Sequence, residues 1–137
     1  MKIAKEFSWE MGHRLPFHKG KCKNLHGHSY QCMIELTGDV DENGIVLDYY
    51  DLKKTVEPVF EELDHAFMVW DGDKELIDAL NKLNSRMVIV NFQTTAENIC
   101  LYLLDKIKLT DLPKNVKAVK VRVFETEKTY AEEEIRL

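Results

Sequence analysis

The residues best suited to chemistry fall in two short segments of the chain. The segment MGHRL contains His13, and the segment KCKNLHGHSYQ contains Cys22, His26 and His28. Neutral imidazoles are suitable ligands for Zn²⁺, and three protein ligands leave a fourth position open, as in catalytic zinc sites. The three histidines therefore predict a catalytic metal site, with iron or another transition metal as the alternative to zinc. The competing interpretation is a polar strand start with a glycine bulge and no metal.

The surroundings of Cys22 are basic. His18, Lys19, Lys21 and Lys23 lie close to it in the sequence. Nearby positive charge favours the thiolate and lowers the pKa of a cysteine from its free value of about 8.5. A thiolate beside a metal is a candidate general base. Alternatively, Cys22 is a small residue in a solvated lysine loop.

Two predicted strands position the histidines. Residues 3–13 alternate, with mostly apolar side chains at odd positions, and residues 26–36 alternate with His26, His28 and apolar side chains at even positions. Side chains two residues apart on a strand share a face. If the two strands pair as a hairpin, His13 reaches the same place as the other two histidines.

The middle of the chain has the period of helices. Apolar residues recur at three and four positions in 49–63, where a proline permits a bend, and 75–83 predicts a short helix. The segment 94–108 predicts a third helix, because Thr94 and Glu97 have the spacing of a capping box. We expect both side chains to cap its first turn.

The remaining strands complete an α+β domain. Residues 85–92 predict a short extended piece, whereas 116–125 and 129–137 predict strands. The order of two strands, helices and two strands predicts an antiparallel sheet covered by helices on one side. No linker or repeat divides the chain, so residues 1–137 are expected to form a single domain.

Composition excludes several classes of protein. The 137 residues include 24 acidic and 19 basic side chains, and the net charge of −5 argues against nucleic-acid binding through bulk charge. The longest apolar runs are too short to cross a bilayer, so no membrane association is expected. Three cysteines at unrelated spacings, Cys22, Cys32 and Cys100, predict free thiols and a cytoplasmic location.

Five segments together resemble the 6-pyruvoyltetrahydropterin synthase and 6-carboxytetrahydropterin synthase family. They are FSWEMGHRL, CKNLHGHSY, LDHAF, TTAENI and VRVFET, in that order over nearly the whole chain. The Cys-xxx-His-Gly-His element is the most specific of them. The resemblance implies a tunnelling fold (T-fold), with a four-stranded antiparallel sheet and helices on its outer face. It also implies that three subunits close a β-barrel and that two barrels stack into a homohexamer with active sites at subunit interfaces.

The resemblance also assigns roles to residues. It implies that Cys22 is the catalytic thiol and that Asp64 and His65 are a catalytic pair, expected at a helix end because adjacent residues of a regular helix do not face each other. The structural alternative for this pair is an ordinary helix C-terminus, where histidine is favourable. The zinc ligands it implies are His13, His26 and His28.

The resemblance places the substrate as well. Glu125 continues the apolar face of a predicted strand, where an unpaired carboxylate would be costly. A pterin ring offers its 2-amino group and N3–H to a carboxylate, and the resemblance gives this role to Glu125. Thr95 and Glu97 are expected to approach the pterin, although a capping role is the default for Glu97.

The spacing between Cys22 and His26 resembles the 6-carboxytetrahydropterin synthases of queuosine biosynthesis. The implied reaction is the zinc-dependent conversion of 7,8-dihydroneopterin triphosphate to 6-carboxytetrahydropterin, acetaldehyde and triphosphate, and the lysines around Cys22 are candidates to hold the triphosphate. One alternative is a 6-pyruvoyltetrahydropterin synthase, which eliminates triphosphate. The other is a metal-binding or pterin-binding module without activity.

Overall fold

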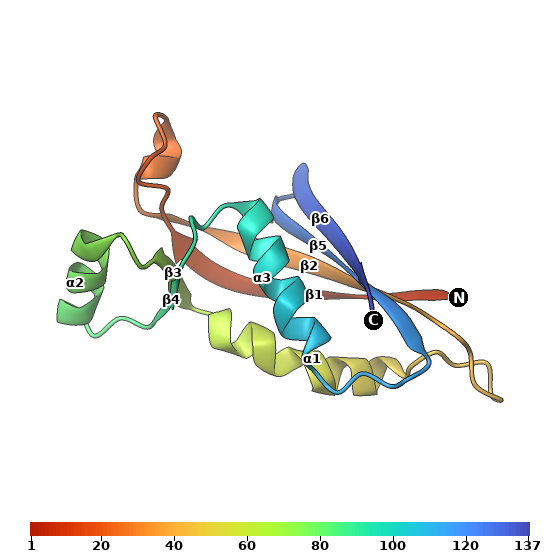
Figure 1. Cartoon of the computed structure of the whole chain (residues 1–137). Coiled ribbons are helices and arrows are strands. Elements are labelled where there is room, and N and C mark those ends of the chain that lie inside the picture. The colour runs from red at the N-terminus through yellow and green to blue at the C-terminus, as the bar shows by residue number, and fades with distance from the viewer.

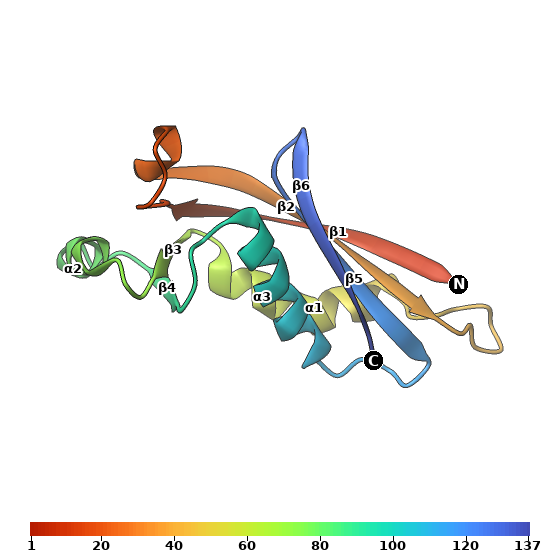
Figure 2. The same cartoon turned by 45° about the horizontal axis from the view of Figure 1, so that its top comes forward.

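The computed structural model describes residues 1–137, and its two longest strands form the hairpin that carries the histidines. Figures 1 and 2 show a curled sheet with two helices, α1 and α3, against one face, while α2 lies beyond one end of the long strands. The elements are β1 (Lys2–His13), η1 (Lys21–Lys23), β2 (His26–Gly38), α1 (Tyr49–Leu63), β3 (Ala66–Trp70), α2 (Lys74–Lys82), β4 (Met87–Val90), α3 (Ala96–Lys108), β5 (Val116–Thr126) and β6 (Thr129–Arg136). None of the helices is both long and apolar enough to span a membrane.

The hairpin of β1 and β2 has the alternation predicted from the sequence. Residues at odd positions of β1 and at even positions of β2 point towards the helices, and His13 is paired with His26 in the antiparallel register. The inward side chains of β2 beyond the histidines are fully buried and pack with those of α3. They are Tyr30, Cys32, Ile34 and Leu36 from the strand, and Ile99, Leu103 and Ile107 from the helix.

The expected four-stranded sheet is wrong, because the sheet has six strands in the order β4-β3-β1-β2-β5-β6. The long strands β1, β2, β5 and β6 pair antiparallel, as predicted, but β3 and β4 add two short parallel strands beside β1. Helix α2 connects β3 to β4 and packs through Leu76 and Leu80 on Val69. Short apolar strands of a parallel pair lack the period-two pattern, so no strand was predicted at residues 66–70 and only an extended piece at 85–92.

The expected capping box at Thr94 is also wrong. Helix α3 begins at Ala96, and its N-cap is Thr95, whose hydroxyl accepts a hydrogen bond from the backbone N–H of Asn98 at 3.3 Å. Thr94 is instead buried and hydrogen-bonded to β1. Both threonines are suitable caps, so only these long-range contacts decide which one is used.

Candidate metal centre

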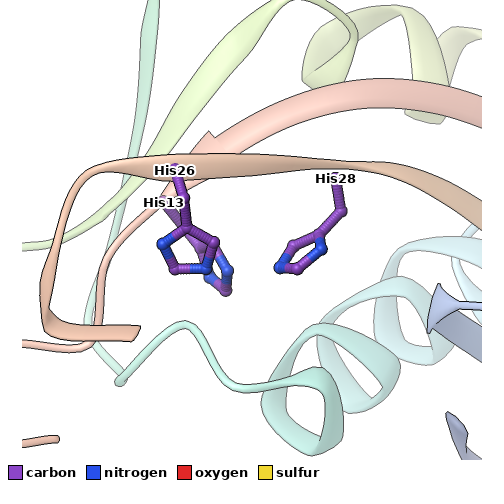
Figure 3. A group of neighbouring side chains, drawn as sticks. All are labelled: His13, His26 and His28. Atoms are coloured by element: carbon purple, nitrogen blue, oxygen red, sulfur yellow. The ribbon is translucent and has the colours of Figure 1, made fainter. Parts of the chain in front are cut away.

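The three histidines converge on one face of the β1–β2 hairpin. Their candidate ligand nitrogens all lie within 4.8 Å of one another. Figure 3 shows the rings of His13, His26 and His28 projecting from the two strands towards the segment that leads into α3. The convergence predicted from the sequence is therefore confirmed as geometry.

Hydrogen bonds of the second ring nitrogen orient two of the histidines. The Nδ1 atom of His13 lies 2.8 Å from the carbonyl oxygen of Thr94, and the Nδ1 atom of His26 lies 2.7 Å from the carbonyl oxygen of Asn24. Each Nδ1 can thus donate, which leaves Nε2 with a lone pair. The Nε2 atom of His26 is buried and has no hydrogen-bond partner. This is the arrangement that metal-binding histidines show, so these residues fit a metal ion.

Two of the histidines, His13 and His28, have a lowered pKa, which favours the neutral form that a metal requires. Burial is the main cause that lowers the pKa of His13 to about 4, and the hydrogen bond to Thr94 opposes this only in part. Burial also lowers the pKa of His28, with Glu125 acting in the opposite direction. A metal ion binds such imidazoles near neutral pH without displacing a proton.

Thr94 supports His13, a role that the sequence analysis missed. Its hydroxyl lies 3.2 Å from His13 Nδ1 and donates to the carbonyl oxygen of Arg14 at 3.3 Å. The guanidinium of Arg14 makes two hydrogen bonds, of 2.7 and 2.6 Å, to the carboxylate of Asp73 at the start of α2. No local signal predicts this support, because Thr94 and His13 are 81 residues apart in sequence.

Glu125 and Tyr30 lie next to the histidines. Glu125 Oε1 is 3.7 Å from His13 Nε2, and its side chain is 25% exposed. The hydroxyl of Tyr30 is 3.4 Å from His13 Nε2 and 3.5 Å from Glu125 Oε1. Burial raises the pKa of Tyr30 well above its ordinary value, and Glu125 adds to this effect. The sequence placed Glu125 on the inner face of its strand, but it gave Tyr30 no role beyond the strand pattern.

Cys22 lies in the loop that joins β1 to β2. This loop contains the short helix η1, and the carbonyl oxygen of Cys22 accepts a hydrogen bond from Leu15 N–H at 2.9 Å. The thiol residue is half-buried, whereas Lys19, Lys21 and Lys23 are exposed. All three cysteines of the chain are free thiols, as predicted. The catalytic role of Cys22 stays a prediction.

Asp64 and His65 form a hydrogen-bonded pair at the end of α1, as expected from the sequence. Asp64 is the C-cap, and its carboxylate accepts from Glu10 N–H at 2.8 Å and lies 2.9 Å from His65 Nδ1. The Glu10 hydrogen bond, followed by that of His65, lowers the pKa of Asp64. His65 has a φ of 57°, and its side chain is 76% exposed.

His65 also lines a cavity that runs along the hairpin. It lines this cavity of about 390 Å³ together with Glu10 and Ser29, whose side chains are hydrogen-bonded to each other. Neighbouring residues of a strand point to opposite faces, so these two side chains lie on the face away from His13 and His28. No hydrogen bond or ion pair joins the Asp64–His65 pair to the three histidines, although His28 and His65 both line this cavity.

The remaining two predicted site residues lie at the start of α3. Thr95 is half-buried and caps the helix. Glu97 is exposed in the first turn, and its carboxylate has no hydrogen-bond partner in the chain. Because Thr94 is not the cap, the capping-box explanation for Glu97 no longer holds.

Comparisons with known proteins show the family and the fold of the chain. The family model described as 6-pyruvoyl tetrahydropterin synthase matches residues 2–135. Proteins named 6-carboxy-5,6,7,8-tetrahydropterin synthase from Haemophilus influenzae and Aquifex aeolicus are 37% and 33% identical, and each alignment covers 96% of both chains. Among solved structures, a 6-pyruvoyltetrahydropterin synthase mutant from Plasmodium vivax has a TM-score of 0.80 at 23% identity, covering 100% of this chain and 98% of that one. The Caenorhabditis elegans 6-pyruvoyl tetrahydropterin synthase has a TM-score of 0.71 at 26% identity, covering 97% and 94%.

Proposed function

The chain belongs to the 6-pyruvoyl tetrahydropterin synthase family, and we propose that it is a zinc-dependent 6-carboxytetrahydropterin synthase. The observation that carries the proposal is that several relatives share the name 6-carboxy-5,6,7,8-tetrahydropterin synthase. They are 31–41% identical to this chain over most of its length. The solved structures named as pyruvoyl enzymes support the fold. The proposed substrate is 7,8-dihydroneopterin triphosphate, and the products are 6-carboxytetrahydropterin, acetaldehyde and triphosphate, in a step of queuosine biosynthesis.

The proposed reaction balances without an external oxidant or reductant. A water molecule is consumed, a carbon–carbon bond of the side chain breaks to release acetaldehyde, and a carbon–oxygen bond breaks to release triphosphate. The side-chain carbon next to the ring is oxidised to the carboxylate, and the dihydropterin ring takes up the electrons as it becomes tetrahydropterin. Protons must therefore be removed and returned at side-chain carbons and at the ring, which requires an acid and a base.

Different residues of the chain bind the metal ion and transfer the protons in this proposal. His13, His26 and His28 would hold the zinc ion, which would polarise the side-chain oxygens of the substrate as a Lewis acid. Cys22 takes a proton from the side chain. His65, whose Nδ1 is held by Asp64 at 2.9 Å, returns one. The members of this set are His13, His26, His28, Cys22, Asp64 and His65.

A second group of residues binds the substrate. Glu125 lies beside His13 and accepts hydrogen bonds from the 2-amino group and N3–H of the pterin, while Thr95 and Glu97 approach the ring from the start of α3. The exposed lysines around Cys22 supply positive charge for the triphosphate. They are Lys19, Lys21 and Lys23.

The position of the Asp64–His65 pair supports a shared active site in a hexamer. The pair contacts the backbone of β1 at Glu10 and makes no hydrogen bond or ion pair with the histidines, and in the proposal a neighbouring chain supplies it to each metal site. The open sheet also ends in two unpaired edges, β4 and β6, which association into a barrel would cover. We therefore propose that three chains close a barrel and that two such barrels stack into a hexamer. We also propose that the protein is located in the cytoplasm.

Product identification tests the proposed function. The zinc-loaded protein is incubated with 7,8-dihydroneopterin triphosphate, and the mixture is analysed by mass spectrometry. We expect 6-carboxytetrahydropterin and an equal amount of acetaldehyde. Formation of 6-pyruvoyltetrahydropterin without acetaldehyde would assign the protein to the pyruvoyl type, and unchanged substrate would favour a binding module. The Cys22→Ala variant is the control, since it should keep zinc and lose turnover.

A further inference from the structure

We propose that Tyr30 is a positioning residue, whose hydroxyl holds the Glu125 carboxylate in the orientation that the pterin ring requires. The inference rests on the proposed function, because it assumes that Glu125 binds a pterin. It adds a residue that connects the metal site to the ring-binding site. The residue touches neither the metal ion nor the reacting atoms, and it acts through the carboxylate.

The ring of Tyr30 is fixed from two sides. The residue is fully buried, and its ring is stacked on Trp9 with 5.0 Å between centroids and 11° between planes. Its centroid is 5.3 Å from that of His28, the histidine that precedes it on the same face of β2. A ring held in this way has little freedom, so its hydroxyl points to a fixed place next to the site.

The hydroxyl of Tyr30 has two acceptors within reach and one proton to give. His13 Nε2 is at 3.4 Å and Glu125 Oε1 is at 3.5 Å. The Nδ1 atom of His13 donates to Thr94, so its Nε2 lone pair is the one available to a metal ion. Once that lone pair binds a metal, it can no longer accept from Tyr30. Occupation of the metal site then leaves Glu125 as the acceptor of the phenol proton.

Glu125 needs such a partner. Three quarters of its side chain is buried, and no lysine or arginine makes an ion pair with it. The polar groups within 4 Å of its carboxylate oxygens are the Tyr30 hydroxyl at 3.5 Å and His13 Nε2 at 3.7 Å, and His28 is near enough for Glu125 to act on its pKa. A carboxylate must be held in one orientation to accept two parallel donors from a ring. A hydrogen bond from Tyr30 occupies one lone pair of Oε1 and leaves the others for the pterin.

The test is a double-mutant cycle read by ligand binding. Binding of unsubstituted pterin to the zinc-loaded protein is measured by calorimetry for the wild type, Tyr30→Phe, Glu125→Gln and the double variant. Phenylalanine keeps the stacking on Trp9 and removes only the hydroxyl. We expect Tyr30→Phe to weaken binding about tenfold, which is the effect of losing one hydrogen bond to a charged group. In the Glu125→Gln background the same change should have less than about a twofold effect.

Three outcomes would overturn the inference. Equal effects of Tyr30→Phe in both backgrounds would show a general packing role. Loss of zinc from the Tyr30→Phe protein would show that the hydroxyl supports the metal site and not the carboxylate. If the wild type does not bind pterin, both the inference and the proposed function are refuted. If the wild type binds pterin tightly but the effects of the two substitutions are additive, the inference alone is refuted. Tyr102→Phe on α3 is the matched control and should leave pterin binding unchanged.

Discussion

Mixing two inactive variants tests whether the active site is shared between chains. Cys22 lies in the loop that leads directly to His26, whereas Asp64 and His65 follow α1 and contact the backbone of β1 at Glu10. If each site takes Cys22 from one chain and His65 from a neighbour, chains carrying Cys22→Ala or His65→Ala can complement each other. Each variant alone should lose activity by about 10²- to 10⁴-fold, the usual contribution of a proton-transfer group.

A site shared between neighbouring chains also predicts how much activity returns. In a randomly assembled equal mixture, about half of the sites receive an intact Cys22, and about half of those receive an intact His65 from the neighbour. The mixture should therefore recover about a quarter of wild-type activity. The two variants are refolded together, and turnover is measured per chain. No recovery would refute the reasoning.

A second mixture controls for assembly. Wild-type chains are refolded with an equal amount of chains that carry both Cys22→Ala and His65→Ala. A shared site predicts about a quarter of wild-type activity here too, by the same count. A site formed within one chain predicts about half, so this mixture separates the two arrangements even when refolding yields differ.

Two further predictions concern the metal and the thiols. The purified protein should contain about one zinc ion per chain, and His28→Ala should lose most of it, because two histidines make a poor zinc site. Plasma emission spectrometry measures the zinc content. Full retention of zinc by the variant would remove His28 from the ligand set. Iodoacetamide at neutral pH should alkylate Cys22 alone in the native protein, since burial raises the pKa of Cys32 and Cys100 and shields both. Peptide mapping shows which thiols react, and modification of Cys32 in the folded protein would contradict the buried placement.

The long antiparallel strands were predictable because half of each strand's surface is buried. Alternation along β1, β2 and β5 gave their inward faces correctly, and with them the convergence of the three histidines. The short strands β3 and β4 were not predictable in the same way. Their apolar runs of five and four residues have no alternation, and their pairing depends on α2 packing beside them.

The residues that support the candidate metal ligands could not be predicted from the sequence, for a related reason. Thr94 looked like a helix cap because local spacing is all that a sequence shows, whereas its contacts reach β1 across 81 residues. The position of Tyr30 in the strand pattern predicted a core residue, and the residue is indeed buried. Its contact with Glu125 depends on the pairing of β2 with β5, which the sequence does not show. The candidate metal ligands come from one hairpin, but their supporting residues come from elements that are distant in sequence.

The folding of the core fixes the positions of the three histidines through the register of one hairpin. His26 and His28 share a face of β2 with Tyr30, Cys32, Ile34 and Leu36, all of which are fully buried. A slip of one residue against β1 would turn this entire set to the exposed face, and each large apolar side chain so exposed costs about 1.5–3 kcal/mol. The same slip would move His13 away from its partner His26. Selection of the correct register by the apolar residues therefore also brings the imidazoles together, without any contribution from a metal ion.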